Sequence, residues 1–69
     1  MINRKDFALL KEGSQVEVRG NFGSGPIELV TVTYVDEDIK NDIPGIDYTS
    51  QRGAGHWAYI HQIDRVVAY

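Results

Sequence analysis

The chain contains no cysteine among its 69 residues, and this absence removes two common sources of stability in small proteins. Without cysteine there is neither a disulfide framework nor a thiolate ligand for zinc, so packing, alone or together with self-association, must hold the fold together. Such a chain suits a reducing compartment, and we expect the protein to be cytoplasmic.

The sequence also lacks a long apolar run and an excess of positive charge. Its N-terminal segment MINRKDFALLKEG is interrupted by charged residues, so it predicts neither a signal peptide nor a membrane-spanning helix, and no membrane partner. Seven basic and ten acidic side chains give a net charge of −3. Proteins that hold nucleic acid through phosphate contacts usually have the opposite balance, so a nucleic-acid partner is disfavoured.

A chain of 69 residues allows only one domain with a thin core. Many enzyme folds need a much longer chain, and the sequence contains no nucleophile elbow, phosphate-binding glycine motif or complete calcium loop. We therefore expect a non-enzymatic module with no catalytic residue, cofactor or metal site. Its size is also typical of accessory proteins of phages and other mobile elements.

Hydrophobic periodicity predicts a short helix followed by five strands. Asn3 is expected to cap a helix of two or three turns that ends before Gly13. Residues 27–35 are apolar at almost every position, which predicts a strand that packs on both faces or bends around a barrel. A polar connection is expected over residues 36–45. The remaining strands are expected at residues 14–20, 46–50, 56–60 and 65–69, with a tight turn over 61–64.

Five short strands with frequent turns predict a small barrel, because so short a chain cannot cover both faces of an open sheet. The order of the expected elements resembles that of SH3-like barrels. It comprises a glycine loop with an aromatic residue, a W-x-Y-I strand, a one-turn helix and a terminal R-V-V strand. The segment VEVRGNFG, residues 16–23, is similar to the opening of a KOW motif, and Tudor modules share this barrel. The resemblance implies a mainly β, five-stranded SH3-like barrel over residues 14–69, with a short helix within residues 1–13, and one domain over 1–69.

Aromatic side chains near the C-terminus are candidates for partner recognition. Alternation in HWAYI places Trp57 and Tyr59 on one face of a strand and Ala58 and Ile60 on the other. The smaller pair suits the interior of a barrel, which leaves the two aromatic residues outside for recognition. The alternative is that Trp57 covers the end of the barrel against the leading helix.

A second aromatic candidate, Phe22, lies among glycines and is either a plug on the barrel end or an exposed anchor. The acidic residues of the 36–47 segment are expected on a solvated loop. The alternatives are that Asp36, Glu37, Asp38 and Asp42 present an acidic surface to a basic partner or mimic the charge of nucleic acid. The predicted protein-binding surface comprises Phe22, Tyr48, Trp57, Tyr59, Asp36, Glu37 and Asp38.

Two alternatives use other parts of the chain. In a nucleic-acid-binding barrel, bases would stack on the aromatic residues while Arg19, Arg52 and Arg65 met phosphates, provided that the fold brings these arginines together. In a homo-oligomer, exposed apolar residues of the leading helix or of the C-terminal VVAY would bury against a copy of the chain, and the C-terminal edge strand is a plausible pairing site because VAY has no polar tail. His56 and His61 are five residues apart, a spacing that points them to opposite faces, so structural roles are expected for both.

Overall fold

The protein is built mainly from β-strands, and the computed structural model describes residues 2–69. No helix in this range is long and apolar enough to cross a membrane. The elements are α1 (Arg4–Phe7), β1 (Gln15–Arg19), η1 (Asn21–Gly23), β2 (Ile27–Lys40), β3 (Ile43–Thr49), β4 (Gly55–Tyr59), η2 (Ile60–Gln62) and β5 (Ile63–Ala68), where η marks a single 3-10 turn.

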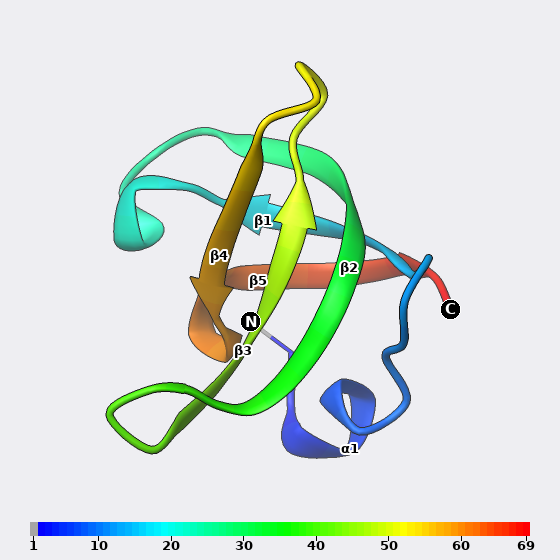
Figure 1. Cartoon of the computed structure of the whole chain (residues 1–69), viewed down its shortest axis with the longest axis vertical. Helices are drawn as coiled ribbons and strands as arrows, with labels where there is room; N and C mark the ends of the chain where they lie inside the picture. Colours follow the sequence, from blue (N-terminus) through cyan, green and yellow to red (C-terminus); the bar gives the residue numbers. More distant parts are fainter. Residues whose placement is uncertain (1) are drawn as a thin grey trace.

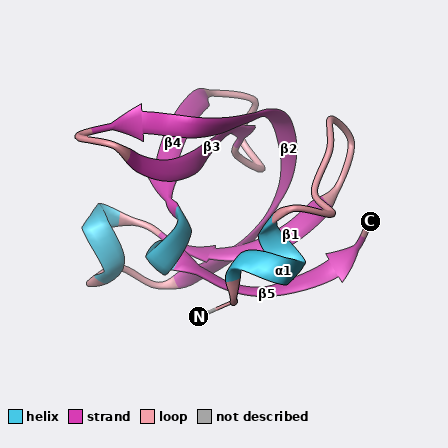
Figure 2. Ribbon diagram, turned by 90° about the horizontal axis from the view of Figure 1, so that it is seen from below, coloured by secondary structure: helices cyan, strands magenta, loops and turns pink. Residues whose placement is uncertain are grey.

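All five strands belong to one antiparallel sheet with the order β4-β3-β2-β1-β5. The long strand β2 is shared, because residues 27–31 pair with β1 and residues 31–40 pair with β3. An irregularity between Val32 and Tyr34, where the pairing register shifts, lies close to the change of partner. In Figure 1, β1 and β5 run across the direction of β3 and β4, and Figure 2 shows that the curved β2 links the two layers.

The sheet is not closed into a barrel by strand pairing. β4 and β5 are its two edges, and no ladder joins them within residues 2–69. The buried side chain of Gln62 forms a local bridge instead: its Oε1 accepts a hydrogen bond from the Tyr59 amide at 2.9 Å, and its Nε2 donates to the Arg19 carbonyl at 3.1 Å. The prediction of a mainly β fold with one short helix is confirmed, whereas a closed barrel is not observed.

The core lies between the two layers and is formed by alternate residues of the strands. Val16 and Val18 of β1 and Ala58 of β4 are buried, as their period-two spacing predicts. The N-terminal segment closes this core by inserting Phe7 and Leu10. These contacts hold the layers together without any cross-link.

The N-terminal helix is a single turn, shorter than the two or three turns predicted. Asn3 caps it as expected, because its Oδ1 accepts a hydrogen bond from the Asp6 amide at 2.8 Å. After Phe7 the chain turns inward, which buries Leu10, and the Lys11 amide donates to the Ser14 hydroxyl at 3.0 Å. Burial of this segment therefore ends the helix well before Gly13.

The polar connection predicted over residues 36–45 is wrong. β2 continues to Lys40 and β3 begins at Ile43, so only Asn41 and Asp42 form the turn between them. Their φ angles of 57° and 61° are those of a two-residue type I′ hairpin turn. The charged residues resemble a loop in sequence, but an antiparallel hairpin with one face in solvent accepts them readily.

The first part of β2 packs on one face only, so the predicted packing on both faces is not observed, whereas the alternative of a bending strand agrees with the curve of β2 between the two layers (Figure 2). Val30 and Val32 point into the core, whereas Ile27, Leu29 and Tyr34 are exposed. The apolar residues on the outer face of this strand therefore contribute to the surface of the molecule.

Candidate functional site

Four aromatic side chains form a continuous row beside the free edge of the sheet. This aromatic row comprises Phe22 of η1, Trp57 and Tyr59 of β4, and His61 of η2. Ring centroids are 6.0 Å apart between Phe22 and Trp57, 5.1 Å between Trp57 and Tyr59, and 5.2 Å between Tyr59 and His61. Two contacts are edge-to-face and the last is stacked, which are favourable geometries for aromatic rings.

The row is exposed, and the leading helix does not cover it. Trp57 is 38% exposed and Phe22 is 69% exposed, while Ala58 points into the core from the opposite face of β4. Phe7 and Leu10 belong to the core, and the rings in contact with Trp57 are Phe22 and Tyr59. Of the two alternatives for each residue, Phe22 is therefore exposed, and Trp57 is not covered by the leading helix.

The backbone of η1 holds Phe22 outward. Phe22 has a φ of 56°, a left-handed conformation that is uncommon for a bulky residue, and the preceding Asn21 has a φ of 51°. The Asn21 side-chain amide donates to the Ser24 hydroxyl at 2.9 Å, and this hydroxyl donates to the Asn21 carbonyl at 2.9 Å. Strained positions of this kind are enriched at sites of recognition.

Tyr48 does not join the exposed row. It is only 7% exposed and stacks on His56 with ring centroids 5.6 Å apart. Burial raises the pKa of the Tyr48 hydroxyl above its ordinary value of 10.0, and the Glu28 carboxylate raises this pKa further. The tyrosine still lines a hollow of about 220 Å³ together with Phe22 and Trp57, so it belongs to the floor of the site.

The carboxylates predicted for the binding surface lie on a hairpin next to the row. We call residues 36–47 the acidic hairpin, because they contain five of the ten carboxylates of the chain. Asp36 is in register with Gly45, which in turn is in register with Tyr59, so all three lie on one face of the sheet. Glu37 and Asp38 follow on the exposed end of β2.

Two carboxylates of the acidic hairpin form hydrogen bonds within the hairpin itself. The Asp36 carboxylate accepts a hydrogen bond from the Asp38 amide at 3.0 Å, and the Asp38 carboxylate accepts one from the Asp42 amide at 2.9 Å. Asp38 is exposed and Asp36 is half-buried, and each carboxylate has a second oxygen atom that can accept further hydrogen bonds.

Two residues of the site, Tyr34 and Lys40, were missed by sequence reasoning. Tyr34 is 59% exposed, and Asp47 lies directly between Tyr34 and Trp57 in the cross-strand register. The Lys40 Nζ lies 5.8 Å from the centroid of the Trp57 ring. These residues become neighbours only through the register of the hairpin. The pair of Asn41 and Asp42 favours a type I′ turn and could have indicated this register.

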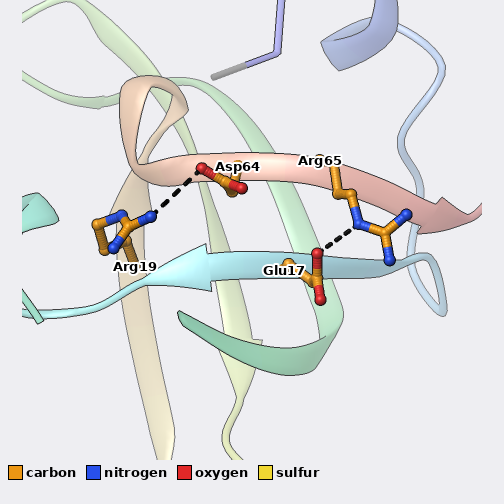
Figure 3. Close-up of polar contacts among 4 residues, drawn as sticks. All are labelled: Glu17, Arg19, Asp64 and Arg65. Carbon is orange, nitrogen blue, oxygen red and sulfur yellow. Dashed lines mark hydrogen bonds and ion pairs between the residues drawn. The ribbon is translucent and has the colours of Figure 1, made fainter. Parts of the chain in front are cut away.

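The three arginines predicted for a nucleic-acid surface do not form one basic patch. Figure 3 shows Arg19 facing Asp64 and Arg65 facing Glu17 on the neighbouring strands β1 and β5. Arg19 and Asp64 are 3.7 Å apart, and the Arg65 Nε makes a close ion pair with the Glu17 carboxylate. Arg52 lies elsewhere, in the turn between β3 and β4, where it lines a hollow of about 470 Å³.

The two histidines also occupy separate environments. His56 stacks on Tyr48 on the core side of β4, whereas His61 stacks on Tyr59 at the end of the aromatic row. Within residues 2–69, no group of three or more His, Asp and Glu side chains is arranged to hold a metal ion.

Comparisons with known proteins do not extend these observations. No family model, curated protein or solved structure matches the chain.

Proposed function

We propose that the protein is a small SH3-like barrel that acts as a non-enzymatic binding or assembly module for a protein partner. The fold proposal is supported by the order of the elements, in which the one-turn η2 precedes the last strand and β2 is shared between two layers. The observation that carries the functional proposal is the exposed aromatic row along β4, the free edge of the sheet.

This combination suits an extended segment of a partner. An edge strand presents backbone amides and carbonyls that can pair with another chain. The aromatic row next to it supplies apolar area, and aromatic residues are enriched among those that dominate binding energy. Because Phe22 and Tyr59 already contact Trp57, its ring loses little freedom when a partner binds.

Selection from a random dodecapeptide library on the immobilised protein tests this function. We expect peptides that bind the wild-type protein and lose at least about tenfold in affinity with Trp57→Ala, because a central aromatic anchor is removed. Leu9→Ala is the matched control, since Leu9 is an exposed apolar residue that follows α1, away from the row. The proposal is wrong if no peptide is enriched, or if the selected peptides bind Trp57→Ala as well as the wild type.

The nucleic-acid alternative has less support. Two of its three arginines are engaged by carboxylates on β1 and β5, so their charge is largely compensated at the surface. The aromatic row is instead bordered by the acidic hairpin, which would repel phosphates.

Self-association is a second candidate, favoured by the other edge of the sheet. β5 has no partner on its outer side within residues 2–69, and Val67 and Tyr69 at its end are exposed. Light scattering over a concentration series should then show a dimer that Val67→Lys converts to monomer. A monomer at every concentration would remove this candidate.

A further inference from the structure

The surroundings of Trp57 indicate the chemistry of the partner, an inference that rests on the proposed function. In the free protein a cation already lies near the indole ring, because the Lys40 Nζ is 5.8 Å from its centroid. This distance falls within the range of a cation–π interaction, for which tryptophan is the best ring. The contact identifies the exposed face of Trp57 as a place where a cationic side chain is stabilised.

The charges around the ring favour a cation for a second reason. The acidic hairpin contains five carboxylates and a single basic residue, Lys40. Asp47 lies directly opposite Trp57 in the strand register, and Asp36 is aligned with Tyr59 across Gly45. Clustered carboxylates beside the row attract a basic segment and orient it during encounter.

We propose that the aromatic row binds an extended basic segment of a protein partner, and that an arginine or lysine of this segment replaces Lys40 over Trp57. The backbone of the segment adds to the free edge of β4, which places alternate side chains toward the row. Lys40 can leave because it is exposed and its flexible stem gives the ammonium other positions in water.

The peptides selected on the wild-type protein provide the first test. We expect arginine or lysine to be enriched in those that require Trp57, and replacement of the critical basic residue by glutamine to lower affinity severalfold. If the selected peptides require Trp57 but contain no essential cation, this inference fails while the proposed function stands. If no selected peptide requires Trp57, the proposed function itself fails.

Substitution of Lys40 provides the second test, with the best selected dodecapeptide as the probe. Lys40→Ala removes the resident cation, so we expect peptide affinity to rise about two- to fivefold, the range expected for an exposed cation–π contact. Lys11→Ala is the matched control, because it removes one positive charge from an exposed lysine outside the acidic hairpin. Lys40→Arg should leave the affinity near that of the wild type.

A double-variant cycle separates competition on the ring from a general effect of charge. In a Trp57→Phe background the gain from Lys40→Ala should shrink, because the weaker ring holds Lys40 less tightly. An equal gain in peptide affinity in both backgrounds, or an equal gain from Lys11→Ala, would contradict the proposal that a cation of the peptide replaces Lys40 over Trp57. Thermal unfolding of each variant by circular dichroism establishes that the measured proteins are folded.

Single-stranded DNA and RNA oligonucleotides, titrated at low salt, complete the test. We expect no change in Trp57 fluorescence with either oligonucleotide. Saturable quenching of Trp57 that weakens steeply with salt, from an oligonucleotide that competes with the peptide, would overturn the proposal of a basic protein segment and favour a nucleic-acid partner.

Discussion

Gly45→Ala should destabilise the protein strongly, because the glycine is buried where β2 and β4 both approach β3. A Cβ at this position would lie 2.6 Å from Cγ2 and 3.0 Å from Cβ of Ile39, and it would also collide with the carbonyl oxygen of Ala58. Favourable contacts between carbon atoms begin at about 3.5 Å. Rotation of Ile39 relieves only one of these contacts, because the Ala58 carbonyl belongs to the backbone of β4.

The size of the effect follows from these two collisions. Overpacking costs about 1–3 kcal/mol, and disturbing a hydrogen bond of the β3–β4 ladder adds about 1 kcal/mol. We therefore expect the free energy of unfolding to fall by about 2–4 kcal/mol and the melting temperature by at least about 10 °C, since 1 kcal/mol shifts it by roughly 4–8 °C in a small domain.

Thermal and urea unfolding, followed by circular dichroism and by Trp57 fluorescence, measure this change. Gly55→Ala is the matched control, because Gly55 also lies in a strand and a Cβ there would have no atom within 4 Å. It should be as stable as the wild type or slightly more stable, through the lower entropy of its unfolded chain. If Gly45→Ala melts at the same temperature as Gly55→Ala, the packing of Ile39 and Ala58 around Gly45 is wrong.

Three further outcomes can be measured on the same protein. Because burial and Glu28 raise the pKa of Tyr48 above 10.0 in the folded state, its stabilising contribution is complete below pH 10 and is lost as the pH rises through the folded pKa. In urea unfolding between pH 8 and 12, the free energy of unfolding should therefore fall less steeply with pH in Tyr48→Phe than in the wild type. An equal slope in the two proteins would contradict the raised pKa of Tyr48. Asp42→Gly should stabilise the type I′ turn by about 0.5–1 kcal/mol in urea unfolding, since glycine adopts its φ of 61° without strain, and any destabilisation would count against that turn. Gln62→Leu should cost about 2 kcal/mol by leaving the Tyr59 amide and a β1 carbonyl without their partner, and Gln62→Glu, which keeps the acceptor, should cost less; equal losses would refute the two-sided bridge.

Local patterns in the sequence predicted the parts of the fold that depend on local physics. The alternation around Val16 and Val18 and around Trp57 and Tyr59 correctly indicated which face of each strand is buried. The Asn3 cap was predicted for the same reason, since capping involves a side chain and an amide three residues away.

The errors concern features that depend on long-range pairing. Composition alone made residues 36–45 resemble a loop, whereas pairing with β3 draws residues 36–40 into β2. Tyr48 was included in the predicted binding surface, but it shares a face of β3 with the buried Ile46 and is itself buried. The contact between Lys40 and Trp57 joins residues that are distant in sequence, so only the register of three strands brings them together.

The division of β2 between two layers affects when the aromatic row is completed during folding. Trp57 and Tyr59 lie on β4 in one layer, whereas Phe22 lies between β1 and β2 in the other layer and is distant from them in sequence, so the contact between Phe22 and Trp57 requires the curved β2 to bring the two layers together. Pairings over long sequence separations are slow to form during folding. The Phe22–Trp57 contact therefore arises late, and an incompletely folded chain lacks the complete aromatic row.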